Sequence, residues 1–293
     1  MADWTDRYWN SAEGLRLHYR DYAGPADKPP IICIPGLSRN ARDFEPVADR
    51  YAGDWRVICI DLRGRGGSEY DPDTKRYAPP FYVADILKLL DQLGIADAVF
   101  VGTSLGGICT MVLAATDSDR IAGAVLNDVG PVIGAVGIDR IGSYIGRETL
   151  FPSWDDARDT LAARNHDIYP DWTIDQWDAF TRRICAEAPG GGVRFDYDMG
   201  IADNFKLAAD QPPVDAWPYF KALAGRPVTI LRGELSDLLT ADTAEKMVEA
   251  LDDIELVTVD RLGHAPSLDE PDALQAIDRL LDRVMERQEE LDA

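Results

Sequence analysis

The chain repeats a pattern in which a short apolar run is followed by a longer segment with apolar residues at helical spacing. Short apolar runs suit strands that are buried on both faces of a parallel sheet. Residues 15–21 instead alternate apolar and polar side chains, as a half-buried strand does. The predicted buried strands are residues 31–34, 55–60, 98–101, 122–126, 227–231 and 254–259, and the accompanying helices are residues 43–51, 81–93, 105–115, 241–251 and 273–288.

Parallel strands need crossover connections, and helices provide them. The alternation therefore predicts an α/β fold with a mainly parallel central sheet that is flanked by helices. Gly94 follows the predicted helix of residues 81–93 and is a typical C-terminal stop, because glycine readily adopts the left-handed backbone found there.

The pattern changes after Pro131. Residues 132–213 hold no strong buried run, and their helix-like segments are rich in aromatic residues. We therefore expect a core formed by residues 1–131 and 214–293, with residues 132–213 inserted as a helical cap. The predicted helices of this cap are residues 137–147, 153–165, 173–187 and 195–209.

Composition excludes several classes of protein. The N-terminal residues are acidic and lack the ~7–15-residue apolar stretch of a signal peptide. No segment approaches the ~18 apolar residues of a membrane span. We therefore expect a cytoplasmic protein without a membrane partner. The widely spaced cysteines, Cys33, Cys59, Cys109 and Cys185, are interpreted as reduced packing residues rather than as disulfides or a metal site.

The formal net charge is −22, from 52 acidic and 30 basic residues. Such a surface repels nucleic acid and anionic membranes, so we expect neither as a partner. A heavily solvated surface, in an acidic or salt-adapted source, is one interpretation of the charge. Attraction of cationic substrates is the functional alternative.

Residues 98–115 carry the first candidate for chemistry. An apolar strand ends at Gly102, and a helical segment begins at Leu105. Gly102, Ser104 and Gly106 fit the pattern G-x-S-x-G, in which a sharp turn exposes a serine hydroxyl at the end of a strand. A serine nucleophile needs a base, and the base needs an acid that holds it in the correct tautomer.

The base is sought among three histidines. His18 lies within an early strand and His166 within the insertion, where structural and surface roles are expected. His264 follows the last predicted strand, and parallel strands bring their C-terminal ends to one sheet edge, so His264 can reach Ser104. Asp237 is the preferred acid because it gives the order Ser, Asp, His.

Other carboxylates stay open as the acid, namely Asp128, Glu234 and Asp260, although aspartate is also common in turns and caps. Two backbone N–H groups are expected to stabilise the oxyanion. One is that of Leu105, directly after the serine, and the other is that of Leu37, in the turn after residues 31–34.

Together these motifs resemble the α/β-hydrolase fold superfamily. The resemblance covers several segments. They are the turn Ile34-Pro35-Gly36-Leu37, the loop 61–68, the sharp turn at the serine (residues 102–107, called the elbow below), the segment 127–131 after a predicted strand, residues 232–237 and Gly263-His264. It implies a mostly parallel central sheet of the eight-stranded type, Ser104 as nucleophile, Asp237 as acid, His264 as base, a helical cap and no cofactor or metal. Serine at the elbow argues against epoxide hydrolases and haloalkane dehalogenases, which use aspartate there. Many members have His-Gly where this chain has Pro35-Gly36.

Residues 37–44 are similar to those of bacterial carboxylesterases, enol-lactonases and meta-cleavage-product hydrolases. We therefore expect a serine hydrolase that opens a small, hydrophobic ester or lactone through an acyl-enzyme on Ser104. One alternative is carbon–carbon bond hydrolysis of a vinylogous keto-acid, with Arg39, Arg42 or a cap arginine binding the substrate carboxylate. Another is a non-catalytic ligand-binding module on a hydrolase scaffold. The expected substrate-binding residues are Arg39, Asp128, Trp154, Trp172 and Trp177, although the tryptophans can equally pack the cap onto the core.

Overall fold

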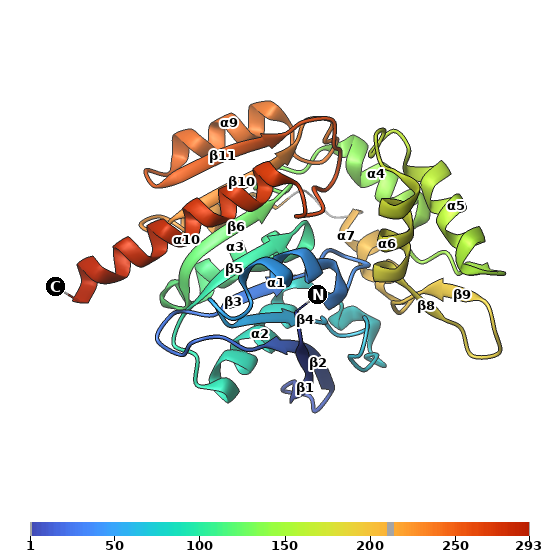
Figure 1. Cartoon of the computed structure of the whole chain (residues 1–293), viewed down its shortest axis with the longest axis horizontal. Helices are drawn as coiled ribbons and strands as arrows, with labels where there is room; N and C mark the ends of the chain where they lie inside the picture. The colour runs from blue at the N-terminus through green and yellow to red at the C-terminus, as the bar shows by residue number, and fades with distance from the viewer. Residues whose placement is uncertain (1, 210–213, 293) are drawn as a thin grey trace.

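The computed structural model describes residues 2–209 and 214–292, and its centre is an eight-stranded sheet (Figure 1). Strands β1 and β2 pair antiparallel, β2 pairs antiparallel with β4, and the remaining neighbours are parallel. The expected α/β fold with a mostly parallel sheet is thus confirmed. In sheet order the strands are β1 (Trp4–Asn10), β2 (Arg16–Tyr22), β4 (Val57–Ile60), β3 (Ile31–Ile34), β5 (Ala98–Thr103), β6 (Ile121–Asn127), β10 (Val228–Gly233) and β11 (Ile254–Val259).

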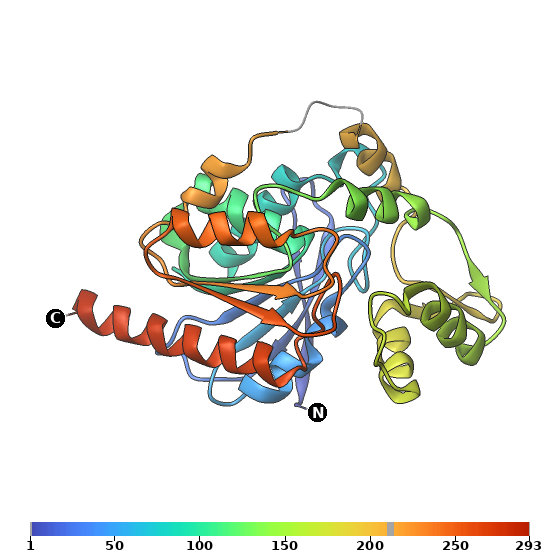
Figure 2. The same cartoon turned by 90° about the horizontal axis from the view of Figure 1, so that it is seen from above.

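Helices cover both faces of the sheet, as Figure 2 shows for α9 and α10 on opposite sides. Successive strand residues point to opposite faces, so Ile32 and Ile34 join one apolar cluster while Ile31 and Cys33 join the other. The first cluster packs against α2 (Pro79–Leu93), α3 (Leu105–Thr116), α8 (Trp217–Lys221) and α9 (Ala241–Ala250), and the second against α1 (Glu45–Tyr51) and α10 (Pro271–Asp292). Short 3₁₀ turns are η1 (Ala41–Phe44), η2 (Thr74–Arg76) and η3 (Ser118–Arg120).

Between β6 and β10 the chain leaves the sheet and forms a separate group of elements beside it (Figure 2). Residues 132–209 of this group are called the insertion below, and its expected end at Pro213 lies outside the described residues. The helices are α4 (Ala135–Tyr144), α5 (Trp154–Asn165), α6 (Ile174–Ile184) and α7 (Ile201–Ala209). A small antiparallel sheet, in the order β7 (Leu150–Phe151), β9 (Val193–Phe195) and β8 (Cys185–Glu187), accompanies them.

This small sheet was not expected, since only helices were predicted for the insertion. The predicted helix of residues 173–187 ends at Ile184, and its last three residues form β8. Strands of two or three residues are too short to display the twofold alternation that reveals a strand in a sequence. Strand β1 was also not expected, and most of its side chains are exposed.

The loops after β3 and β4 are joined by the buried carboxylate of Asp61. Its Oδ1 accepts a hydrogen bond from the Ala41 N–H at 2.6 Å, and its Oδ2 accepts one from the Gly67 N–H at 2.8 Å. His18 Nδ1 lies 2.7 Å from the same Oδ2, and His18 Nε2 lies 3.0 Å from Asp6 Oδ1. His18 therefore has the structural surroundings expected of it, and it anchors the loop that leads to the active-site edge.

The four cysteines are buried free thiols. Among the helices of residues 2–209 and 214–292, none is long and apolar enough to cross a bilayer.

We expect the stability of the protein to fall as the pH rises above about 6.5, in part because of His18. Burial disfavours the charged imidazole, but the hydrogen bonds and charges of Asp61 and Asp6 outweigh burial and raise its pKa above 6.5. A raised pKa in the folded state adds stability that is present below the unfolded-state pKa and is lost as the pH passes the folded-state pKa. Thermal unfolding of His18→Asn between about pH 6 and pH 9 should show a flatter dependence than the wild type. His166→Asn, at an exposed histidine, is the control and should keep the wild-type slope.

Candidate active site

Ser104 lies on a sharp turn between β5 and α3, and its backbone φ is +53°. A side chain at either flanking glycine would collide with backbone. A Cβ on Gly102 would lie 2.5 Å from the Gly106 carbonyl carbon, and one on Gly106 would lie 2.0 Å from the Ile34 oxygen. The G-x-S-x-G pattern is thus explained by close packing of β3, β5 and α3, which presents the serine hydroxyl at the sheet edge.

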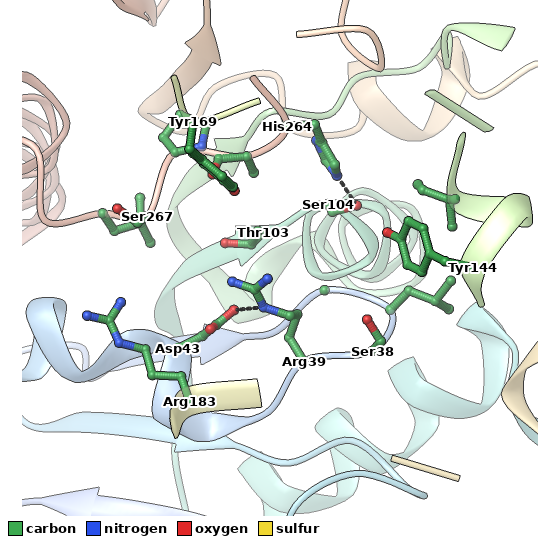
Figure 3. A pocket seen from close by; sticks show the side chains of 16 residues that line it. Ser38, Arg39, Asp43, Thr103, Ser104, Tyr144, Tyr169, Arg183, His264 and Ser267 are labelled. Atoms are coloured by element: carbon green, nitrogen blue, oxygen red, sulfur yellow. Dashed lines mark hydrogen bonds and ion pairs between the residues drawn. The ribbon is translucent and has the colours of Figure 1, made fainter. Parts of the chain in front are cut away.

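His264 lies in the loop after β11, and its Nε2 is 2.9 Å from Ser104 Oγ (Figure 3). Three contacts hold this loop. Asn127 Nδ2 donates to the Pro266 carbonyl at 2.9 Å, and the Tyr169 hydroxyl donates to the Ala265 carbonyl at 2.9 Å. The Gly263 N–H donates to the Ile168 carbonyl at 2.7 Å. Both the core and the insertion therefore position the histidine.

Asp128 is the carboxylate that contacts His264. It directly follows β6, is 0% exposed, and its Oδ2 lies 2.8 Å from His264 Nδ1. The same Oδ2 accepts a hydrogen bond from the Ser236 hydroxyl at 2.6 Å, and Oδ1 accepts one from the Gly233 N–H at 2.9 Å. Ser104, His264 and Asp128 thus form one hydrogen-bonded chain. Because Asp128 is buried behind the histidine, its expected role in substrate binding does not fit its position.

Asp237, the acid expected from the sequence, binds Arg140 of α4 instead, through contacts of 2.6 and 2.7 Å. Burial raises the pKa of Asp237, but the hydrogen bonds and charge of Arg140 outweigh burial and lower it. The assignment of Asp237 as the partner of His264 is therefore corrected to Asp128, the alternative that the sequence left open. Glu234 is also engaged elsewhere, since it accepts the N–H of Arg261 at 2.8 Å.

The turn after β3 lies directly beside the serine. A Cβ on Gly36 would lie 3.7 Å from Ser104 Cβ, and Leu37 lines the pocket that contains Ser104. The fully buried Arg65 holds this turn, because its Nε donates to the Leu37 carbonyl at 2.9 Å. Leu105 begins α3, where backbone N–H groups lack partners within the helix. This placement is compatible with the expected oxyanion hole of Leu37 and Leu105.

Two adjoining cavities open at this edge. The smaller, of about 80 Å³, contains Ser104, Thr103 and the turn that includes Leu37. The larger, of about 410 Å³, extends under the insertion. The residues that line both cavities are Ser38, Arg39, Tyr144, Tyr169 and His264.

Neither cavity is lined by Trp154, Trp172 or Trp177 in the described parts of the chain, which corrects the expectation that these residues bind substrate. Trp172 stacks on Tyr169 with ring centroids 3.8 Å apart, and Trp177 lies 4.8 Å from Trp172. Trp154 lies under the guanidinium of Arg182. Trp172 and Trp177 thus pack against the Tyr169 ring, in agreement with the packing interpretation.

The aromatic side chains that do line the larger cavity are Tyr144, Tyr169, Phe180, Phe195 and Tyr197. The sequence placed aromatic residues in the insertion, but it carried no signal for which of them face Ser104.

Of the two arginines named from the sequence, Arg39 lies at the site and Arg42 does not. Arg39 lines both cavities, and its Nε donates to Asp43 at 2.7 Å (Figure 3). Its guanidinium also lies over the Phe180 ring, 4.4 Å from the centroid. Arg42 binds Asp196 and the Arg183 carbonyl. Within residues 2–209 and 214–292, no group of His, Cys, Asp or Glu side chains is arranged to hold a metal ion.

Comparison with known proteins identifies the family to which the chain belongs. The model of the alpha/beta hydrolase family matches residues 31–277, and the chain belongs to this family. It is therefore a hydrolase-family protein with the sheet, elbow and histidine loop described above.

Individual relatives cover nearly the whole chain. The 3-hydroxybutyrate-oligomer hydrolase of Cupriavidus necator is 33% identical over 271 residues, 89% of this chain and 91% of that protein. The 2-(acetamidomethylene)succinate hydrolase of Mesorhizobium japonicum is 28% identical over 87% of this chain and 88% of that protein. A crystal structure of an alpha/beta hydrolase from Novosphingobium aromaticivorans is 51% identical, with a TM-score of 0.93, over 97% of this chain and 99% of that chain.

The two aspartates can be separated by one pair of matched variants. Asp128→Asn should lower kcat on a p-nitrophenyl ester by about 10⁴-fold, because an asparagine there no longer holds His264 in the required tautomer or stabilises its charged form. Asp237→Asn should stay within about tenfold of the wild type, since Asp237 contacts Arg140 rather than His264. Circular dichroism of both variants checks that each is folded. A larger loss of kcat for Asp237→Asn than for Asp128→Asn would contradict the assignment.

Proposed function

We propose that the protein is a serine hydrolase that cleaves a carboxylic ester through an acyl-enzyme on Ser104. The observation that carries the proposal is the continuous hydrogen-bonded chain from Ser104 through His264 to the buried Asp128. A serine hydroxyl is a weak nucleophile by itself, and this arrangement supplies the base and the group that orients it.

In the first half of the reaction, Ser104 Oγ attacks the ester carbonyl carbon while His264 Nε2 accepts the hydroxyl proton. Asp128 stabilises the resulting imidazolium through Nδ1. The N–H groups of Leu37 and Leu105 stabilise the negative oxygen of the tetrahedral intermediate. Collapse of the intermediate breaks the bond to the alcohol oxygen, which takes the proton from His264, and the acyl group remains on Ser104.

In the second half, water takes the place of the alcohol. His264 accepts a proton from the water as its oxygen attacks the acyl-enzyme, and a second tetrahedral intermediate forms in the same oxyanion hole. Its collapse returns the proton to Ser104 Oγ and releases the carboxylic acid. A lactone follows the same steps, with the alcohol and the acid joined in one product.

The full-length similarity to a 3-hydroxybutyrate-oligomer hydrolase supports an ester as the substrate. The insertion acts in this proposal as a cap, because Tyr144, Tyr169 and Phe180 come from it and line the cavity that His264 also lines. The volume of about 410 Å³ suits a small-molecule substrate.

The proposal is tested by chemical labelling of the serine. A fluorophosphonate should modify wild-type protein once, and peptide mapping should place the adduct on Ser104. Ser104→Ala should escape labelling and lose about 10⁶-fold in kcat on a p-nitrophenyl ester. Ser118→Ala, at a serine of η3 outside both cavities, is the matched control and should be labelled at the wild-type rate. Wild-type protein that is folded but neither labelled nor active on any ester or lactone of a broad panel would refute the proposal.

A further inference from the structure

The larger cavity carries positive charge in a protein whose net charge is −22. Four arginines line it, Arg39, Arg140, Arg147 and Arg164, and no Asp or Glu among the described residues does. The smaller cavity adds Arg183, and its only acidic lining residue among those described is Asp43. The charged residues that line the cavities around Ser104 are thus mainly positive, whereas the net charge of the protein is negative.

Two of these charges are neutralised by carboxylates. Arg140 forms a bidentate ion pair with Asp237, and Arg39 donates to Asp43 through Nε. The terminal nitrogens of Arg39 have no hydrogen-bond partner among the described residues, and they point into the pocket in Figure 3.

Arg147 and Arg164 have no carboxylate partner in the described parts of the chain. Most arginines of this protein pair with acidic side chains, donate to backbone oxygens or stack on aromatic rings. Within residues 2–209 and 214–292, the arginine side chains without such a contact are Arg147, Arg164, Arg183, Arg194 and Arg287, and the first three line the cavities. Three of these five arginines therefore lie at the site.

The two arginines of the larger cavity come from different parts of the insertion. Arg147 follows α4, and Arg164 lies in the last turn of α5. Glu148, next to Arg147 in the sequence, is exposed and does not line the cavity. Guanidinium groups present several N–H donors in a plane, which matches the two oxygens of a carboxylate.

We propose that the substrate carries a carboxylate in addition to the scissile ester, and that Arg147 and Arg164 bind this carboxylate in the larger cavity. The inference rests on the proposed ester hydrolysis at Ser104 and adds the chemical class of the substrate. The larger cavity is the place for the charged group because the smaller one, at about 80 Å³, is occupied by the reacting atoms. Arg39 lines both cavities and adds positive charge between the carboxylate-binding arginines and Ser104.

The kinetic test compares matched esters. Mono-p-nitrophenyl glutarate carries the carboxylate on the acyl side and is paired with neutral p-nitrophenyl pentanoate. The ester 4-acetoxybutanoate carries the carboxylate on the alcohol side and is paired with neutral 4-acetoxybutanamide. The wild type should prefer the charged member of at least one pair in kcat/KM. The double variant Arg147→Gln/Arg164→Gln should lower kcat/KM on that charged ester by about 10- to 100-fold, mainly through KM, and stay within about threefold on its neutral match.

Arg287→Gln is the matched control. It removes the same charge from an arginine of α10, whose C-terminal end lies on the opposite side of the molecule from the insertion (Figure 1), and it should leave both esters unaffected. Added NaCl should reduce the preference for the charged ester in the wild type, since the two arginines are exposed to solvent.

A binding measurement separates this inference from the proposed reaction. Isothermal titration of wild-type protein with glutarate and with neutral glutaramide should show tighter binding of glutarate, and the double variant should lose that difference. Glutarate binding without turnover of any ester would refute ester hydrolysis and leave the carboxylate site standing. Ester turnover with no preference for a charged member of either pair, or an equal loss on charged and neutral esters in the double variant, would overturn the carboxylate site.

Discussion

The active-site edge depends on one strained backbone conformation, the positive φ of Ser104. A non-glycine residue in such a conformation costs about 1–3 kcal/mol, and it persists only where the surroundings enforce it. Here the enforcement is steric, because Gly102 and Gly106 let α3 approach β3 and β5 more closely than any side chain would allow. Ser104 is therefore positioned by packing of the core rather than by contacts of its own side chain. The neighbouring loops approach a residue whose position is already fixed.

Those loops are fixed by buried polar groups, each of which joins segments that are distant in the sequence. Asp61 joins the loops after β3 and β4, Arg65 holds the Leu37 carbonyl, and Asn127 ties the histidine loop to the end of β6. A buried polar group without a partner is costly, so the Asp61 carboxylate, the Arg65 Nε–H and the Asn127 Nδ2–H favour the loop arrangement in which each has its partner. In the described parts of the chain, Arg65 Nη2 and Asn127 Oδ1 have no hydrogen-bond partner. The site is preorganised because the same hydrogen bonds that make the loops stable also set their geometry.

Local patterns and long-range contacts differ in how far a sequence reveals them. The buried strands, the sharp turn at Ser104 and the position of His264 beside it could be predicted, since each is marked by its own residues and by the rule that parallel strands end at one edge. The carboxylate that contacts His264 could not be predicted, because Asp128 and Asp237 both lie between Ser104 and His264 in the chain and both follow strands that are neighbours in the sheet. What distinguishes them is Arg140 of the insertion, which binds Asp237. The tryptophans illustrate the same limit, since an aromatic-rich segment does not reveal which rings face the cavity and which lie behind it.

The net charge of the chain and the charge of the cavity lining favour substrates of opposite charge. A net charge of −22 suggested, as the functional alternative, attraction of cationic substrates, whereas arginines line the cavity beside Ser104. The surface charges and the cavity arginines act on a substrate over different distances. At physiological ionic strength the field of exposed charges decays over about 8 Å, so the acidic surface weakly opposes the approach of an anion. Inside the cavity, direct hydrogen bonds from guanidinium groups to a carboxylate are screened far less. Selectivity for an anionic ester would therefore arise after entry, from contacts within the insertion, and not from electrostatic steering by the protein surface.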